Sequence, residues 1–162
     1  MNLFLPEHCK LVDATGGPAN TFAATTCDYV SLKDTIMAWI VLQFDQATGH
    51  ETVIYPQVAT SVLPTGATSI TFAADIWSNE DTATSDALVK RTSATSYYVE
   101  DDVASKMVVI KIDPSKVAAQ GSDYDCIGCV VSDSKAQANY VSGLYVLQQR
   151  MPEATPRTVL LD

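Results

Sequence analysis

Apolar and polar residues alternate in short runs along most of this chain, and clusters of turn-forming residues separate the runs. The longest run covers residues 35–44, where even-numbered apolar positions share one face of an extended strand and odd-numbered positions, including Trp39, share the other. A capping-box pattern at residues 31–34 would also allow a helix. The β-branched and aromatic content, and the turn at residues 47–49, favour a strand buried on both faces.

Seven further segments have the length and composition of strands. They are residues 51–59, 69–77, 87–92, 96–100, 106–113, 124–132 and 139–150. Pro56 lacks a backbone N–H, so its strand is expected at a sheet edge or a bulge. Asp113 and Pro114 predict a short helical turn over residues 114–120. The pattern predicts an all-β antiparallel sandwich of about seven to eight strands, of jelly-roll or Ig-like type.

The chain divides into one domain and two arms. Residues 1–27 are expected to form an extended N-terminal arm because turn and linker residues dominate this segment. Residues 28–150 form the sandwich domain. Residues 151–162, which contain Pro152 and Pro156, form a C-terminal arm. With 162 residues, of which 47% are hydrophobic, one domain has enough apolar surface for a core.

The charge of the chain limits the classes of molecule that it is expected to bind. The formal net charge is −9, and among the scattered basic residues only Lys90 and Arg91 are adjacent. Binding to nucleic acid needs clustered cations, so no nucleic-acid partner is expected. No stretch approaches the roughly 18 apolar residues of a membrane span, and the first residues lack the features of a signal peptide. We therefore expect a soluble protein made inside the cell, with no membrane partner.

The four cysteines, Cys9, Cys27, Cys126 and Cys129, are expected to be free, buried thiols. Cys126 and Cys129 form a C-x-x-C pattern, which also occurs in zinc sites and redox pairs. In a strand, however, residues three apart point to opposite faces, and no second C-x-x-C is present. Core positions are therefore favoured over metal binding or redox chemistry, and no cofactor is expected.

Other candidates for catalysis or metal binding are sparse. His8 and His50 could each serve a small hydrolase if the fold set one beside a nucleophile and a carboxylate, but no nucleophile motif is present. Acidic residues cluster at 80–86, 100–102 and 123–125. None of these segments follows a calcium-binding loop pattern, so solvated turn carboxylates are favoured over Ca²⁺ sites. The sequence therefore points away from an enzyme.

The two ends of the chain carry apolar tips joined through residues rich in Pro and Gly. These candidate interface residues are Leu3, Phe4, Leu5, Val159, Leu160 and Leu161. Such tips often dock on a neighbouring subunit as an added strand. Packing on the chain's own domain and simple fraying are the alternatives.

Three segments of the chain carry a family resemblance: residues 28–34 leading into 38–41, residues 76–79 continuing through 81–83 to 86–89, and the ending 154–156. These segments are similar to small structural proteins of tailed bacteriophages. The resemblance implies a structural part of the virion, a capsid decoration (cement) protein or another head-associated component, with no active site. The implied location is the capsid exterior, after synthesis in the cytoplasm of the bacterial host.

The implied partner is the major capsid protein, together with self-association, for example as a trimer. Many copies on a symmetric lattice turn weak contacts into avidity. A tail or fibre module that binds a host receptor or glycan is an alternative, and it would use exposed aromatic residues, with Tyr97 and Tyr98 as candidates. A small hydrolase is a second alternative.

Overall fold

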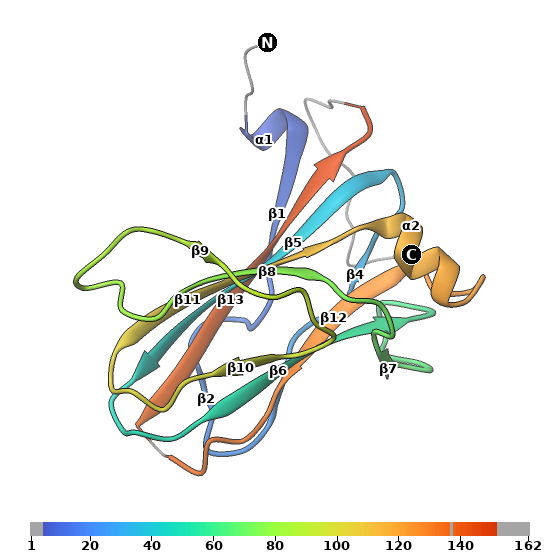
Figure 1. Ribbon diagram of the computed structural model, residues 1–162. Coiled ribbons are helices and arrows are strands. Elements are labelled where there is room, and N and C mark those ends of the chain that lie inside the picture. The colour runs from blue at the N-terminus through green and yellow to red at the C-terminus, as the bar shows by residue number, and fades with distance from the viewer. Residues whose placement is uncertain (1–4, 137, 152–162) are drawn as a thin grey trace.

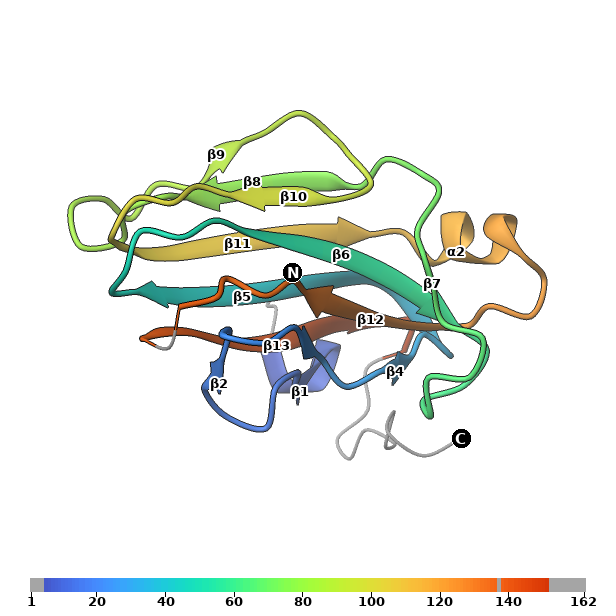
Figure 2. The same cartoon turned by 90° about the horizontal axis from the view of Figure 1, so that it is seen from below.

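The computed structural model describes residues 5–136 and 138–151, and they form a sandwich of two antiparallel β-sheets (Figure 1). Figure 2 shows the two layers, with α2 at one end. The described residues contain thirteen strands, of which seven have five residues or more. The predicted all-β antiparallel sandwich is confirmed, and the additional strands are short segments that extend the sheet edges.

The larger sheet has seven strands in the order β1-β13-β5-β11-β8-β9, with β2 also paired to β13. They are β1 (Cys9–Asp13), β2 (Ala19–Asn20), β5 (Thr35–Gln46), β8 (Asp75–Asn79), β9 (Val89–Lys90), β11 (Ser105–Ile112) and β13 (Asn139–Gln149). β5 pairs along most of its length with β13 on one side and with β11 on the other. The central segment is therefore a strand, as predicted, and not a helix.

The smaller sheet has six strands in the order β10-β6-β12-β3, with β4 paired to β12 and β7 paired to β6. They are β3 (Thr25–Thr26), β4 (Val30–Ser31), β6 (Thr52–Ala59), β7 (Thr68–Ser69), β10 (Tyr97–Val99) and β12 (Cys126–Val131). The helices are α1 (Leu5–His8) and α2 (Pro114–Gln120). α2 begins as predicted, because the Asp113 carboxylate accepts a hydrogen bond from the Ser115 N–H at 2.9 Å.

The core lies between the inner faces of the two sheets. Fully buried apolar side chains come from alternate positions of facing strands, which is the period-2 pattern of a half-buried strand. They include Ala38, Ile40, Leu42, Val108, Ile110, Ile112, Ile54, Val58, Ile127 and Val131. The outer face of β5 is different: Trp39 and Val41 are only half-buried. The prediction that β5 is buried on both faces is therefore wrong, because no second layer from the described residues covers that side.

The N-terminal segment is not an extended arm over its described part. β1 pairs with β13, β2 pairs with the beginning of β13, and β3 pairs with β12. Residues 9–27 therefore belong to the sandwich, and the predicted boundary at residue 28 is wrong. Five ladder pairs between β1 and β13 satisfy backbone groups that the sequence pattern had assigned to a linker. Residues 1–4 and 152–162 lie outside the described residues.

The predicted strand at residues 69–77 is two strands in different sheets. β7 pairs with β6, and β8 pairs with β11 and β9, so the chain crosses between the layers at residues 70–74. The alternating burial is nevertheless real, since Ile70, Ala74 and Ile76 are buried. β6 is central rather than an edge strand. Pro56 lies between the residues of β6 that pair with β10 and the residues that pair with β7. Its missing N–H therefore removes no hydrogen bond from either ladder.

A charged network closes the edge of the core between β8 and β11. Lys106 is fully buried, its ammonium donates to the Glu100 carbonyl at 2.5 Å, and it lies 3.9 Å from Glu80 Oε2. The other oxygen, Glu80 Oε1, accepts from the Tyr97 hydroxyl at 2.5 Å and lies 3.4 Å from Arg91. Glu80 is thus an ion-paired carboxylate with 19% of its side chain exposed, and not the solvated turn residue predicted.

The two partners of this buried pair should respond differently to substitution. Glu80→Leu leaves the Lys106 ammonium buried without a counter-ion, and we expect it to lower the free energy of unfolding by about 3 kcal/mol. Lys106→Met removes the buried charge and leaves Glu80 with Arg91 and Tyr97, so the expected change is below about 1 kcal/mol. Urea unfolding at neutral pH measures both values. An equal or larger loss in Lys106→Met would contradict this account.

One buried tyrosine, Tyr29, and one half-buried tyrosine, Tyr97, predict alkaline sensitivity. Burial raises the pKa of Tyr29 to about 12, and burial together with the Glu80 hydrogen bond raises the pKa of Tyr97 to about 12. The folded state holds these protons more tightly than the unfolded state. The contribution of the two hydroxyl groups to the free energy of unfolding is therefore complete below about pH 10 and is lost as the pH rises through about 12.

A double variant, Tyr29→Phe with Tyr97→Phe, should therefore lose less of its free energy of unfolding than the parent protein between about pH 9.5 and 11.5. Urea unfolding at a series of pH values is the measurement. Tyr140→Phe is the matched control because Tyr140 is 40% exposed. If the double variant and the parent protein lose stability in parallel, the assignment of alkaline sensitivity to these two hydroxyls is wrong.

Candidate binding surface

The outer face of the larger sheet is built by the register between β13 and β5. Side chains of both strands alternate between the core and this outer face. Four directly opposed outer pairs follow along the ladder: Val146 with Trp39, Leu144 with Val41, Ser142 with Gln43, and Tyr140 with Asp45. The face therefore changes from apolar to polar toward the end of β5.

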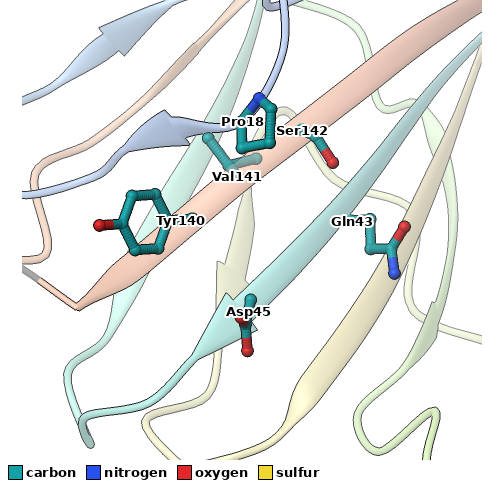
Figure 3. Close-up of a pocket in the computed structure, with 6 residues that line it drawn as sticks. All are labelled: Pro18, Gln43, Asp45, Tyr140, Val141 and Ser142. Carbon is teal, nitrogen blue, oxygen red and sulfur yellow. The ribbon is translucent and has the colours of Figure 1, made fainter.

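Two adjoining depressions lie on this face, and we call them together the sheet groove. The polar depression has a volume of about 400 Å³ and is lined by Pro18, Gln43, Asp45, Tyr140, Val141 and Ser142 (Figure 3). The apolar depression has a volume of about 410 Å³, and its side chains include Leu11, Val41, Met107 and Leu144. Gln43 and Ser142 line both depressions. Each volume lies within the roughly 300–1,000 Å³ of small-molecule sites.

The loop between β1 and β2, residues 14–18, forms one wall of the sheet groove. Asp13 Oδ1 accepts hydrogen bonds from the N–H groups of Thr15 and Gly16, both at 3.0 Å. Gly16 has a φ of 66°, a conformation that glycine adopts without strain. At the base of the loop, the Ala14 N–H donates to the Gly143 carbonyl at 2.9 Å, and Ala14 is fully buried. The wall is therefore tied to β13.

Gly143 allows this close approach. A Cβ at this position would meet Leu42 Cδ2 at 2.4 Å and the Val41 carbonyl oxygen at 3.0 Å. The Gly143 N–H also donates to Thr15 Oγ1 at 3.2 Å. The absence of a side chain at residue 143 thus lets the loop, β13 and β5 pack tightly beneath the groove.

The polar depression offers unused hydrogen-bonding groups. Within the described part of the chain, the side chains of Gln43, Asp45, Tyr140 and Ser142 make no hydrogen bond or ion pair with protein. Tyr140 is 40% exposed, and Gln43 and Asp45 are exposed as well. The residues that line the groove include two carboxylates, Asp13 and Asp45, and no cationic side chain. The groove therefore disfavours an anionic ligand.

At the opposite end of β13, the last residues of this strand lie beside the first residues of β1. Cys9, at the start of β1, pairs with Gln148 near the end of β13. A third depression, of about 570 Å³, lies at this end and is lined in part by Ile36, Pro114 and Arg150. Ile36 is 47% exposed. We call this region the terminal end.

The candidate interface residues predicted from sequence lie almost entirely outside the described residues. Leu3, Phe4, Val159, Leu160 and Leu161 belong to segments 1–4 and 152–162. The backbone of Leu5 begins α1, which leads directly into β1. Their role as an interface stays a prediction.

The cysteines behave as core residues. All four are buried. Cys126 and Cys129 point to opposite sides of the smaller sheet, as predicted: Cys126 contacts Tyr29 and Ala59, whereas Cys129 lies in the main core with Cys27. A hydrogen bond with Cys27 and burial raise the pKa of Cys129, and burial raises the pKa of Cys9. Such thiols are poor nucleophiles at neutral pH.

The other sequence candidates do not assemble into a site. His8 lies in α1 and His50 in the turn between β5 and β6, and no hydrogen bond joins either imidazole to a serine, cysteine or carboxylate in residues 5–136 and 138–151. Across the same residues no three metal-ligating side chains cluster. Tyr97 and Tyr98 point to opposite faces of β10; Tyr97 donates to Glu80 and Ser78, and Tyr98 is 49% exposed. They form no shared aromatic platform.

The grouping of the groove residues into one site was not predicted from the sequence. Residues 35–44 and 139–150 were predicted as strands, but the pairing of β13 with β5 was not. Polar residues at the ends of two otherwise apolar strands, such as Asp45 and Tyr140, were the available signal. Only the register reveals that these residues are neighbours.

No helix in the described ranges combines the length and hydrophobicity needed to cross a membrane. No family model matches the sequence, and no curated protein matches it.

Among solved structures, the chain is similar to the SPBc2 prophage-derived protein YomS, with 7% identity and a TM-score of 0.45 over 86% of this chain and 95% of that one. It is similar to a family 28 carbohydrate-binding module specific for non-crystalline cellulose, with 9% identity and a TM-score of 0.36 over 88% of this chain and 73% of the module. A family 11 carbohydrate-binding module of the Clostridium thermocellum cellulase Lic26A-Cel5E has 11% identity and a TM-score of 0.34, with 91% of each chain covered. Similarities of this strength do not specify a function.

Proposed function

We propose that this protein is a non-enzymatic structural protein of a tailed bacteriophage, a capsid decoration protein that stabilises the head by bridging neighbouring capsomers. The phage assignment rests on the sequence resemblance at residues 28–34 with 38–41, residues 76–79 with 81–83 and 86–89, and residues 154–156. The observation that carries the mechanism is the pairing of Cys9 with Gln148. Because of this pairing, the segments that precede β1 and follow β13 continue from adjacent points of the sandwich.

The terminal end has the features of an attachment surface. The apolar residues Leu3, Phe4 and Leu5 precede β1, and Val159, Leu160 and Leu161 follow β13. The exposed side chain of Ile36 and the depression beside Pro114 lie at the same end. Apolar arms that leave from one point can bind one site on a partner together, so that their contributions combine.

The outer edge of β1 adds backbone groups to this surface. In the larger sheet β1 is the first strand of the order, so its second edge has no partner strand among the described residues. An edge of this kind can accept a strand from another chain. The proposed partners are the major capsid protein and further copies of this chain, for example in a trimer, on the exterior of the capsid.

Substitution in the C-terminal tip tests the attachment. The triple variant Val159→Ser, Leu160→Ser and Leu161→Ser should bind heads at least about a hundredfold more weakly, because each buried branched side chain contributes about 1.5–3 kcal/mol. Co-sedimentation of the purified protein with phage heads that lack it is the measurement. An N-terminal variant with Leu3→Ser and Phe4→Ser should also bind more weakly.

The matched control carries the same kind of change elsewhere on the surface. Leu63, Leu88 and Val103 are 74%, 43% and 64% exposed and lie in loops or beside β9, and none of them lines the depression at the terminal end. Changing all three to Ser should leave head binding within about twofold. Unchanged binding of both tip variants would refute attachment through the arms. Absence of the protein from purified particles would refute a virion role altogether.

A further inference from the structure

We infer that the sheet groove is a binding site for a neutral oligosaccharide, held by stacking on Tyr140 and by hydrogen bonds to Asp45, Gln43 and Ser142. This activity goes beyond attachment to the capsid. It uses a different part of the molecule, because the polar depression of the groove lies at the far end of β13 from Gln148. At about 3.3 Å per residue, roughly 25 Å separates the two ends.

The backbone atoms of the groove floor are not free to bind a ligand. In the groove, β13 is paired with β2 on one side and β5 on the other, and β5 is paired with β13 and β11. The backbone N–H and C=O groups of the floor are therefore used within the ladders. An extended peptide that adds as a strand needs a free edge, which the polar depression lacks. Recognition here has to come from side chains.

The side chains of the polar depression match the chemistry of a sugar ring. Tyr140 provides an aromatic ring at the rim, and its ladder neighbour Asp45 provides a carboxylate with its Cβ roughly 4.5–5.5 Å away. Gln43 supplies both an amide donor and an acceptor, and Ser142 supplies a hydroxyl. A sugar ring presents an apolar C–H face bordered by hydroxyl groups, so it matches an aromatic plane beside convergent polar groups.

The charge and the rigidity of the groove also fit a neutral oligosaccharide. Asp13 and Asp45 give the groove two carboxylates, and no cation lines it, so uronic and sialic acids are disfavoured. The polar side chains stand on strands paired on both sides, and the wall is fixed by the bonds between the 14–18 loop and Gly143. A preformed site loses little entropy on binding. The groove continues into the apolar depression beside Leu11 and Leu144, which extends the site beyond one sugar ring.

The experiment screens the isolated protein on an array of neutral and acidic glycans that includes glucans, mannans, galactans and N-acetylglucosamine oligomers. We expect binding to neutral oligosaccharides and not to oligogalacturonic acid or polysialic acid. The strongest neutral glycan is then titrated by calorimetry against variants. Tyr140→Ala should weaken binding by about tenfold or more, whereas Tyr140→Phe, which keeps the ring, should stay within about threefold.

Tyr98→Ala is the matched control, because Tyr98 is also an exposed tyrosine on a strand but lies on the smaller sheet. It should leave the affinity unchanged, and Asp45→Asn should weaken it. Circular dichroism and thermal unfolding check that each variant is folded. Binding of no neutral glycan, binding of acidic glycans alone, or equal effects of Tyr140→Ala and Tyr98→Ala would overturn the proposal. Because the assay contains no phage heads, its failure is separate from a failure of capsid attachment.

Discussion

The antiparallel pairing of β13 with β5 is the constraint on which the rest of this structure depends. It runs from Asn139 opposite Gln46 to Gln148 opposite Met37 without a shift. Side chains alternate between the two faces, so a slip of β13 by one residue would turn Tyr145 outward and Ser142 into the core. Burial of the apolar set therefore selects one register, and that register also decides which residues become neighbours on the outer face.

The two ends of β13 carry different chemistry, and they lie the length of this strand apart. One end brings the beginning and the end of the described chain together through Cys9 and Gln148, and the other joins Tyr140 to Asp45. Attachment through apolar arms and recognition through a polar groove then do not compete for the same side chains. With a net charge of −9 and two carboxylates in the groove, the electrostatics disfavour anionic partners there.

The errors of sequence interpretation share one physical cause. Cys9–Asp13 looked like part of a linker because its stabilising partner, β13, lies near the other end of the chain. Residues 69–77 alternate like one strand but cross between two sheets, and local periodicity does not record which sheet a residue joins. Glu80 lies in a polar stretch, and its ion pair with Lys106 depends on how β8 and β11 align. Each error concerns a contact between segments distant in sequence.

The sequence by itself determined the all-β class, most of the long strands, the helical turn after Asp113 and the burial of the cysteines, because β-branched alternation and turn residues act locally. The tertiary structure alone decided the strand order, the inclusion of residues 9–27 in the sheets, and the groove formed by Tyr140, Asp45, Gln43 and Ser142. Those features depend on register between distant strands, and register is selected by burying one apolar core rather than by any local pattern.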